Sequence, residues 1–373
     1  MLDAILERWN LRRAFERVRE NGGCRGADGM TLGQFAGDLE RELDRLEDRL
    51  LRRVYHPYPL LQFTVPKRSG GTRFLCVPTV RDRVAQTAVD LIVRSIFEAE
   101  FEDSSYAFRR GRSVRDAVRK VCELRDQGYR WLVDADIQSC FDSIPHDRLL
   151  ERLSRMPLDT DVLDLFALWI RTEVYNGHVL KIPERGIPQG SVVSPLLANL
   201  FLDELDESLA LFEQAIVRYS DDFLVLCRDE SRAEGALEVT DSLLESLGLE
   251  LNREKTSITH FDQGFKFLGA LFVGDDAELP LAVRILVSYD ISDDRRRTRL
   301  AHLLKDFGER VQYSVFECNL EEAPLARLQA RVGALIDAER DSVRIYRLCA
   351  ECAGKLEVRG NGRRIEDPDV YVL

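Results

Sequence analysis

Two adjacent carboxylates, Asp221 and Asp222, lie between two short apolar runs, and this arrangement restricts the fold more than any other stretch. The runs, Ala215-Ile216-Val217 and Phe223-Leu224-Val225-Leu226, have strand composition, which predicts a hairpin with both acids at its tip. Burying two acids without a counter-charge is costly, and hard oxygen ligands suit Mg²⁺. A metal site is therefore one interpretation. The alternative is a solvated turn, in which Asp is common.

Length and composition favour a soluble globular protein with two domains. The chain has 373 residues, of which 45% are hydrophobic and 32% charged. No apolar run approaches the roughly 18 residues of a membrane-spanning helix, so no membrane partner is expected. The first residues, Met1 to Arg8, carry acids early and lack a signal-peptide core, which predicts a cytoplasmic protein. The eight cysteines indicate reduced thiols, and the isolated pair Cys349 and Cys352 favours packing over zinc.

The net charge of −12 argues against a protein coated in basic surface. Residues 281–373 hold 16 basic and 16 acidic residues, so residues 1–280 carry the whole acidic excess. A nucleic-acid site must therefore be a local basic channel.

Residues 61–78 predict a second hairpin, with Ser69-Gly70-Gly71 at its tip. Lys67 and Arg73 flank the tip, which suits a loop that closes on an anionic ligand. An exposed basic hairpin is the alternative. Further along, a basic loop with aromatics ends at Ser113, which is well placed to cap the next helix. Residues 129–137 predict a strand that Asp136 closes.

The pattern restarts after a linker predicted at 274–283. Residues 284–291, 313–319 and 342–348 predict strands, and residues 293–309 and 321–336 predict helices. Short strands are expected at 355–358 and 370–373. This order over fewer than 100 residues is typical of a ferredoxin-like βαββαβ domain, which we assign to residues 284–373.

Residues 20–270 resemble prokaryotic reverse transcriptases of the group II intron type. The matching blocks, in family order, are Gly26 to Met30, Pro66 to Arg73, Val77 to Gln86, Tyr106 to Arg109, Asp136 to Phe141, Gly186 to Pro195, Tyr219 to Asp222, Lys255, and Phe267 to Gly269. The resemblance implies an α+β fold with the fingers and palm of a right-hand polymerase over residues 1–273. It also implies an RNA template, a DNA primer and deoxynucleoside triphosphates as partners.

The resemblance assigns the chemistry to three carboxylates. A palm sheet would bring Asp136 beside Asp221, so that both hold two Mg²⁺ ions, with Mn²⁺ as the alternative ion. One ion would activate a primer 3′-hydroxyl and the other would neutralise the leaving pyrophosphate. Asp222 would support the pair in a less direct role.

The resemblance also assigns contacts to the substrates. Lys67 and Arg73 would clamp the triphosphate by charge-assisted bonds. Gln189 and Gly190 would let backbone and amide approach the nascent base pair, and Lys255 would donate a proton to the leaving group unless it is a surface lysine. Two cations of the basic loop, Arg109 and Arg112, would contact nucleic acid.

Phe141 follows Asp136 by five residues, where the family places an aromatic ring beneath the sugar. A large ring there would collide with a ribose 2′-hydroxyl, which predicts deoxynucleotide substrates. The alternative is a core phenylalanine. One departure from the family concerns the thumb, because only about a dozen residues separate Gly269 from the second module. A missing or minimal thumb puts processivity and intron splicing in doubt.

The C-terminal module resembles the CRISPR-associated protein two family, the small subunit of the spacer-acquisition complex. The match lies in Val287 to Ile291, Arg295 to Arg297, Gly308 to Cys318, Asp341 to Tyr346, and Asp369 to Val372. The resemblance implies a homodimer that bridges the CRISPR adaptation integrase and holds DNA. Arg295, Arg296 and Arg299 would face phosphates. Asp290 fits the position of a metal-binding acid, although we favour a scaffold over a nuclease.

Together the two resemblances predict an RNA-directed DNA polymerase fused to a CRISPR adaptation subunit, which would support spacer acquisition from RNA. The alternative function is a non-catalytic nucleic-acid-binding scaffold of the adaptation integrase complex.

Overall fold

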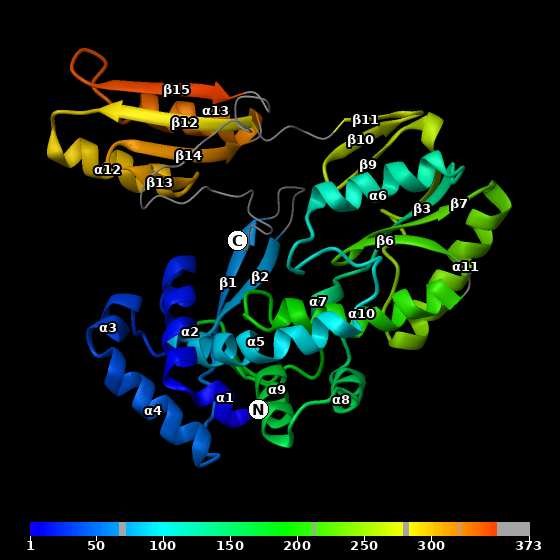
Figure 1. Ribbon diagram of the computed structural model, residues 1–373, viewed down its shortest axis with the longest axis horizontal. Coiled ribbons are helices and arrows are strands. Elements are labelled where there is room, and N and C mark those ends of the chain that lie inside the picture. The colour runs from blue at the N-terminus through cyan, green and yellow to red at the C-terminus, as the bar shows by residue number, and fades with distance from the viewer. Residues whose placement is uncertain (67–71, 212–213, 279–282, 321, 349–373) are drawn as a thin grey trace. The chain divides into compact units, whose positions relative to one another are not determined.

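The computed structural model describes residues 1–66, 72–211, 214–278, 283–320 and 322–348 (Figure 1). The chain divides into two compact units. The first consists of Met1–Leu268 with Phe272–Asp276, and the second of Gly269–Leu271 with the described residues from Ala277 onward. In the described part of the chain, no helix has both the length and the apolar character needed to cross a bilayer.

The first unit is built from helices around two sheets. The helices are α1 (Leu2–Leu6), α2 (Arg8–Asn21), α3 (Leu32–Gly37), α4 (Leu39–Leu51), α5 (Val80–Glu100), α6 (Val114–Asp126), α7 (Cys140–Ser143), α8 (His146–Ser154), α9 (Thr160–Ile170), α10 (Ser194–Leu211) and α11 (Glu230–Leu247), with a 3₁₀ turn at Phe261–Gln263. Helix α6 begins as predicted, because Ser113 forms a capping box with Asp116. Helices α5 and α10 are buried on most of their surface, so they form the centre of the hydrophobic core.

The predicted Asp-Asp hairpin is confirmed. Strands β6 (Ala215–Tyr219) and β7 (Asp222–Cys227) pair antiparallel in a sheet of order β6-β7-β3-β8. The other two strands are β3 (Trp131–Asp136) and β8 (Ser257–His260), both antiparallel to their neighbours. Most of β7 is buried, which explains its continuous apolar run. The ends of β3 and β7 that carry the acids therefore meet at one edge of a firmly packed sheet.

The second predicted hairpin is also confirmed. Strand β1 (Leu60–Pro66) pairs antiparallel with β2 (Thr72–Val77) in a sheet of order β2-β1-β4-β5, completed by β4 (Val174–Tyr175) and β5 (Leu180–Lys181). The predicted tip at residues 69–71 and Lys67 lie outside the described residues.

A third sheet is formed by residues 265–278, which include part of the range predicted as a linker. It has the order β11-β10-β9 and consists of β9 (Phe265–Phe267), β10 (Ala270–Val273) and β11 (Asp276–Glu278). Residues 279–282 are not described, and the next strand starts at Val283. Among the described residues between β9 and Val283 there is no helix.

The second unit is one antiparallel sheet with two helices. Its elements are β12 (Val283–Asp290), α12 (Asp294–Lys305), β13 (Glu309–Gln312), β14 (Val315–Leu320), α13 (Glu322–Gly333) and β15 (Ser342–Leu348), and the strand order is β13-β14-β12-β15. Ile285 and Val287 of β12, Leu304 of α12 and Leu328 of α13 are buried in one core cluster. The strands predicted at 355–358 and 370–373 lie outside the described residues.

One predicted boundary in this unit was wrong. The helix expected over residues 293–309 ends at Lys305, and Glu309 already belongs to β13. Gly308 lies so close to β14 that a Cβ atom would stand 2.2 Å from the Glu317 carbonyl oxygen. The close approach of the two backbones at this glycine turns the chain from helix into strand.

Candidate active site

Three carboxylates gather at one edge of the β6-β7-β3-β8 sheet. Asp136, the last residue of β3, lies directly opposite Asp222, the first residue of β7. Asp221 occupies the tip of the hairpin, where its carbonyl oxygen accepts a hydrogen bond of 3.3 Å from the Ile137 amide. The register of two antiparallel strands therefore brings together acids that are 85 residues apart in sequence.

The Asp136 carboxylate has a partner on each oxygen. Lys255 donates from Nζ to Oδ1 at 2.9 Å, and Asn252 donates from Nδ2 to Oδ2 at 3.0 Å. The Asn252 amide also donates to the Asp136 carbonyl oxygen at 2.8 Å. The segment before β8 thus supplies the only counter-charge that the described residues offer to Asp136, and the structure places Lys255 beside the acids.

Asp221 and Asp222 hold their protons more tightly than carboxylates in water, because the pKa of each is raised. Burial raises the pKa of Asp222 to about 7, and the neighbouring charges of Asp134, Asp221 and Asp136 add to the effect. Burial also raises the pKa of Asp221, and a hydrogen bond with the Ser220 side chain works against that shift. Negative charge is therefore concentrated at the hairpin tip beyond what the protein neutralises.

Sequence reasoning missed a fourth acid, Asp134. It lies two residues before Asp136 on the same face of β3, and burial followed by the charge of Asp136 raises its pKa to about 6. The signal was present in the sequence, since side chains two residues apart in a strand share a face, and the stretch Asp134-Ala135-Asp136 has this spacing.

The carboxylate oxygens of Asp136, Asp221 and Asp222 are the ligand type that a divalent cation prefers. Their side chains are not arranged around a common point that could hold the ion. Within the described ranges, no three His, Cys, Asp or Glu side chains are arranged to hold a metal. At Asp136 both carboxylate oxygens accept hydrogen bonds, from Lys255 and Asn252. Partly buried carboxylates such as Asp221 and Asp222, whose pKa values are raised, present the concentration of negative charge that Mg²⁺ or Mn²⁺ relieves.

The hairpin is anchored from behind by Arg218, which sequence reasoning also missed. Its side chain is fully buried and forms an ion pair with the equally buried Asp206 of α10. The guanidinium also donates to the Ser220 carbonyl oxygen at 3.1 Å, to Asn199 Oδ1 at 3.1 Å and to Ser105 Oγ at 2.9 Å. Arg218 therefore ties the turn that carries Asp221 to helix α10 and to the basic loop.

Ser220 adopts a left-handed backbone conformation with φ of +64°. That conformation is uncommon for residues with a side chain, and it orients the tip of the hairpin. The serine contributes through two atoms, since its carbonyl accepts from Arg218 and its side chain bonds Asp221.

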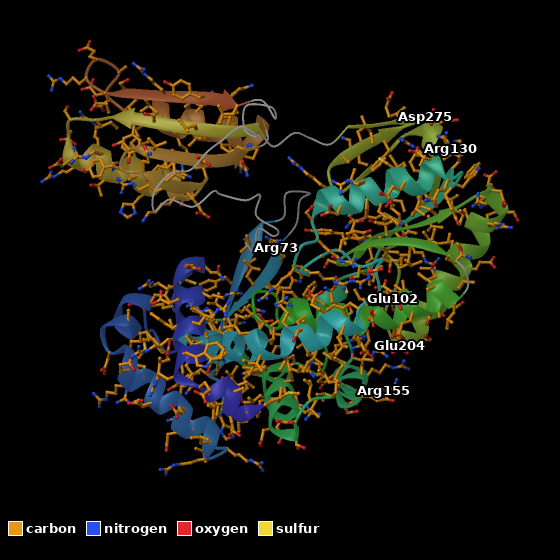
Figure 2. The ribbon with its side chains drawn as sticks, viewed as in Figure 1. Arg73, Glu102, Arg130, Arg155, Glu204 and Asp275 are labelled. Carbon is orange, nitrogen blue, oxygen red and sulfur yellow. The ribbon has the colours of Figure 1, made fainter. Side chains whose placement is uncertain are left out.

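Arg73 and Phe141 are both partly buried. Arg73 lies on β2 opposite Val65, and its Nε is buried without a hydrogen-bond partner among the described residues (Figure 2). Phe141 is partly buried on α7 and packs against the main core, and its carbonyl oxygen accepts from the Ile187 amide at 2.7 Å. Phe141 thus packs against the core with part of its surface exposed.

Gln189 and Gly190 pack against the β1-β2 hairpin. The Cys76 amide of β2 donates to the Gln189 carbonyl oxygen at 2.7 Å. Gly190 has a φ of +105°, and a Cβ there would stand 2.8 Å from the Cys76 carbonyl oxygen. The glycine is therefore required by the fold, whatever else approaches it.

The structure gives Arg109 and Arg112 structural partners instead of an open surface. Arg109 is 6% exposed, and its donors go to Glu98 and to the carbonyl oxygens of Glu102 and Ser105. Arg112 pairs with Asp103 and also bonds the Ser105 carbonyl oxygen. Both cations hold the loop in shape, which leaves Arg109 in particular with no free face for nucleic acid.

Of the site residues predicted in the second unit, one is ion-paired within the fold and the other three are exposed. Arg296 pairs with the fully buried carboxylate of Asp341, so it fastens α12 to the segment before β15. Arg295 and Arg299 are exposed, and no described residue bonds either of them. Asp290 is exposed at the end of β12, opposite Ser342 of β15.

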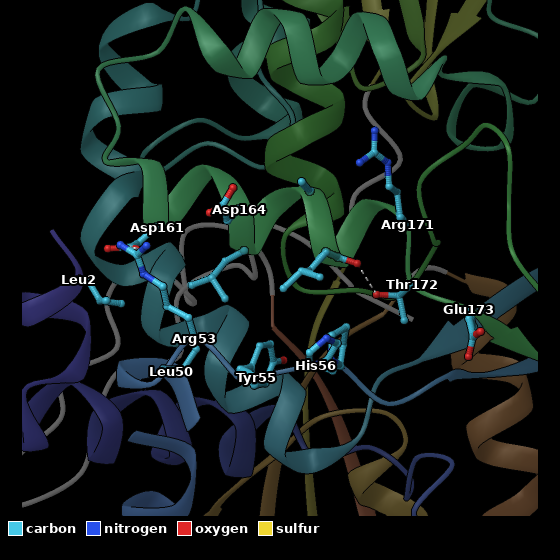
Figure 3. Close-up of a pocket in the computed structure, with 14 residues that line it drawn as sticks. Leu2, Leu50, Arg53, Tyr55, His56, Asp161, Asp164, Arg171, Thr172 and Glu173 are labelled. Carbon is cyan, nitrogen blue, oxygen red and sulfur yellow. Dashed lines mark hydrogen bonds and ion pairs between the residues drawn. The ribbon is translucent and has the colours of Figure 1, made fainter. Parts of the chain in front are cut away.

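A hollow of about 620 Å³ opens in the first unit, away from the acids. Leu50, Tyr55, Leu165 and Leu168 contribute to its lining, and the Arg53–Asp161 ion pair lies at its margin (Figure 3).

Comparison with known proteins identifies the first unit. Residues 65–272 match the family described as reverse transcriptase (RNA-dependent DNA polymerase). Protein YkfC of Escherichia coli K12 is 32% identical over 283 residues, which cover 65% of this chain and 74% of YkfC.

This chain belongs to the reverse transcriptase family.

The reverse transcriptase also resembles longer intron proteins. The group II intron-encoded protein LtrA of Lactococcus lactis is 31% identical over 195 residues, which cover 52% of this chain and 32% of LtrA. The chain thus spans about a third of the length of that relative. The partial Cas6-RT-Cas1--Cas2 complex aligns with a TM-score of 0.41 and 24% identity, over 65% of this chain and 42% of that one.

The C-terminal part of this reverse transcriptase belongs to a second family. Residues 283–356 match the family described as CRISPR associated protein Cas2. A protein named CRISPR-associated endoribonuclease Cas2 1, from Chloroflexus aurantiacus, is 47% identical over 90 residues, which cover 24% of this chain and 97% of that protein. The two matched segments do not overlap, so one chain carries a reverse transcriptase followed by a Cas2 module.

Proposed function

We propose that this chain synthesises DNA on an RNA template and serves CRISPR spacer acquisition from RNA. The observation that carries the proposal is the register of β3 against β7, which sets Asp136 opposite Asp222 beside the hairpin tip of Asp221. Membership of the reverse transcriptase family supports polymerisation, and the Cas2 module on the same chain supports a role in adaptation.

The acids Asp136, Asp221 and Asp222 would hold the divalent ions. Mg²⁺ bound there would supply charge neutralisation and a lower pKa for a primer 3′-hydroxyl. Lys255 carries its proton at neutral pH, because its hydrogen bond with Asp136 raises its pKa. Lys255 Nζ lies 2.9 Å from Asp136 Oδ1, beside the acids that would hold the ions, and we propose that it donates a proton to the leaving pyrophosphate.

Arg73 is the described residue that we propose to bind the triphosphate, since its Nε has no hydrogen-bond partner among the described residues. We propose that Lys67, which lies outside the described residues, acts with it. Gln189 and Phe141 would contact the base pair and the sugar.

For the Cas2 module we propose a ferredoxin-like fold and a scaffold function. The strand order β13-β14-β12-β15, with α12 and α13 as the connections, supports the fold. Arg295 and Arg299 are exposed without partners in the described part of the chain, which supports contacts to DNA phosphates. We further propose that the module forms a homodimer and binds the adaptation integrase.

Primer extension on an RNA template tests the polymerase. The full chain should incorporate deoxynucleotides in the presence of Mg²⁺, and Asp221→Ala and Asp222→Ala should abolish incorporation. Asp147→Ala, an exposed acid at the start of α8, should leave it intact. Wild-type chain that stays inactive, with or without the adaptation integrase, would support the second candidate function, a non-catalytic scaffold.

Integration assays test the role in adaptation. The adaptation integrase supplied with this chain should insert a sequence copied from RNA, and Asp221→Ala should restrict insertion to DNA. Insertion of RNA-derived sequence by the Asp221→Ala chain would contradict the proposal.

A further inference from the structure

Helix α2 presents three different faces. Leu11, Phe15 and Val18 are buried in the main core on the first face. On the second face, Arg8 pairs with Asp44 and Glu47 of α4, and Arg12 pairs with Glu40 of the same helix. These two faces fix α2 to its neighbours (Figure 1).

The third face carries Trp9, Arg13 and Arg17. Their spacing of four residues keeps them in one stripe, which drifts by about 40° per step around the helix. The Trp9 side chain is 56% exposed, although a tryptophan is usually well buried. No described residue forms a hydrogen bond or an ion pair with Arg13 or Arg17. The stripe is therefore unused by the fold.

A fourth side chain joins this stripe from a distant segment. Arg110 belongs to the loop after α5, and this loop is fixed where Arg94 of α5 donates to the Phe108 carbonyl oxygen at 3.0 Å. Burial lowers the pKa of Arg17, the charges of Arg110 and Arg13 lower it further, and the charge of Asp90 acts against the shift, so the three guanidinium groups lie within electrostatic range. Asp90 itself pairs with Arg94. Arg110 is exposed and has no partner among the described residues.

The grouping is unusual for this chain. Its first 280 residues carry the whole acidic excess, and the neighbouring arginines Arg8, Arg12 and Arg19 each pair with an acid. Three unpaired arginines that repel one another cost free energy, which an anion bound between them would recover. The stripe ends at Glu20, one turn beyond Arg17.

We propose that Trp9, Arg13, Arg17 and Arg110 bind a single strand of RNA. The three guanidinium groups contact backbone phosphates, and the exposed indole stacks on a base. An aromatic side chain in line with cations is the combination that holds single strands, whereas a paired duplex hides its base faces. From Trp9 to Arg17 the stripe extends about 12 Å along the helix, which is long enough for more than one phosphate. The proposal deepens the proposed function by giving the template a contact outside the acid site.

The test measures binding of a fluorescent single-stranded RNA oligonucleotide to the full chain at several salt concentrations. The triple variant Arg13→Gln, Arg17→Gln, Arg110→Gln should bind more weakly. Its slope of log affinity against log salt should be smaller by about 0.7 for each lost phosphate contact. The matched control is Arg12→Gln with Arg19→Gln, which removes two ion-paired arginines of the same helix and should leave the slope unchanged.

Trp9 supplies a direct readout. RNA should quench part of the tryptophan emission, and Trp9→Phe should abolish this quenching while Trp131 and Trp169 remain. Trp9→Ala should weaken binding about tenfold. Melting temperatures of all variants verify that the fold is intact.

Several results would overturn the proposal. One is an unchanged salt slope in the triple variant, and another is a loss of RNA affinity in the control variant equal to that in the triple variant. Displacement of the oligonucleotide by inorganic phosphate at matched phosphate concentration would mark a site for free phosphate instead. Binding of duplex alone would also contradict it. Asp221→Ala separates the two proposals, because it should bind RNA normally without extending a primer. A wild-type chain that binds RNA through the stripe without extending a primer would count against the polymerase only.

Discussion

Arg218 and Asp206 form an ion pair in which both side chains are fully buried, directly behind the turn that carries Asp221. An arginine inside a strand would ordinarily be expected to face solvent. Here the same guanidinium also donates to the Ser220 carbonyl oxygen, so the position of the turn that carries Asp221 depends on a charge pair in the core.

Replacing Arg218 by Met should destabilise the protein strongly. It would leave the Asp206 carboxylate buried and unpaired, which typically costs about 3–5 kcal/mol. The double variant Arg218→Met, Asp206→Leu should regain much of that stability but not the primer-extension rate, because the Ser220 carbonyl oxygen loses its donor. Urea denaturation and extension rates measure the two effects. Full recovery of the rate in the double variant would show that the pair serves stability alone.

Lys255→Gln should tighten Mg²⁺ binding while slowing polymerisation. The lysine ammonium lies 2.9 Å from Asp136 Oδ1 and competes with an ion for that oxygen. Its proposed proton donation would be lost, and such a contribution is typically about 10²–10⁴-fold. Calorimetric titration with Mg²⁺ and single-turnover rates measure both. The control is Arg253→Gln, which lies on the same segment as Lys255 and removes an ion pair with Asp241 of α11. Weaker Mg²⁺ binding in Lys255→Gln would refute the competition.

Phe141→Ala should admit ribonucleotides. If the ring blocks a 2′-hydroxyl, the ratio of kcat/KM for deoxynucleotides over ribonucleotides should fall at least about tenfold. Phe63→Ala, at a 42% exposed position on β1, should leave the ratio unchanged. A lower melting temperature with the same ratio would instead make Phe141 a core residue.

Gly190→Ala should cost more than Gly177→Ala. Both glycines have a φ near +100°, at +105° and +93°, so both substitutions strain the backbone by roughly 1–3 kcal/mol. Only at Gly190 would the new Cβ also meet a carbonyl oxygen, that of Cys76, at 2.8 Å. The difference between the two free energies of unfolding isolates this contact. Equal losses would mean that the hairpin shifts to accept the methyl group.

Stability should fall as the pH rises from about 4 to about 7, in part because of Asp203. Burial raises the pKa of Asp203 to about 7, so the folded state binds its proton more tightly than the unfolded chain does. This contribution is complete below the unfolded pKa and is lost as the pH passes the folded one. Asp203→Asn should flatten the profile by on the order of a few kcal/mol, as denaturation between pH 4 and pH 8 would measure. Asp203 and Glu207 both form ion pairs with Arg152, so Glu207→Gln is the comparison. Parallel profiles in wild type and Asp203→Asn would contradict the assignment.

The sequence predicted the hairpins and the acids because these depend on local patterns. Two short apolar runs on either side of Asp221-Asp222 predict an antiparallel hairpin, which β6 and β7 form. The turn residues Ser69-Gly70-Gly71 likewise predict the pairing of β1 with β2. The resemblance to intron enzymes then placed Asp136 beside them. Asp134 could have been added from strand alternation alone.

The roles of the charged residues were harder to predict. Arg109 was expected on a nucleic-acid surface and lies inside a loop, whereas Arg218 attracted no expectation and is a central buried cation. No local feature separates the two cases. Whether an arginine is buried depends on whether an acid or a carbonyl oxygen from another segment meets it, and Asp206 and Glu98 are brought there only by the folded chain.

Strand β8 pairs with β3 across more than 120 residues of sequence, and Lys255 reaches Asp136 from just before that strand. A growing chain therefore cannot complete the acid site until residue 260 has left the ribosome. Until then β3 has an unpaired edge, which is the kind of surface that seeks another strand. The order of synthesis thus makes the catalytic edge one of the last parts of the polymerase unit to mature and exposes it to mispairing while it waits.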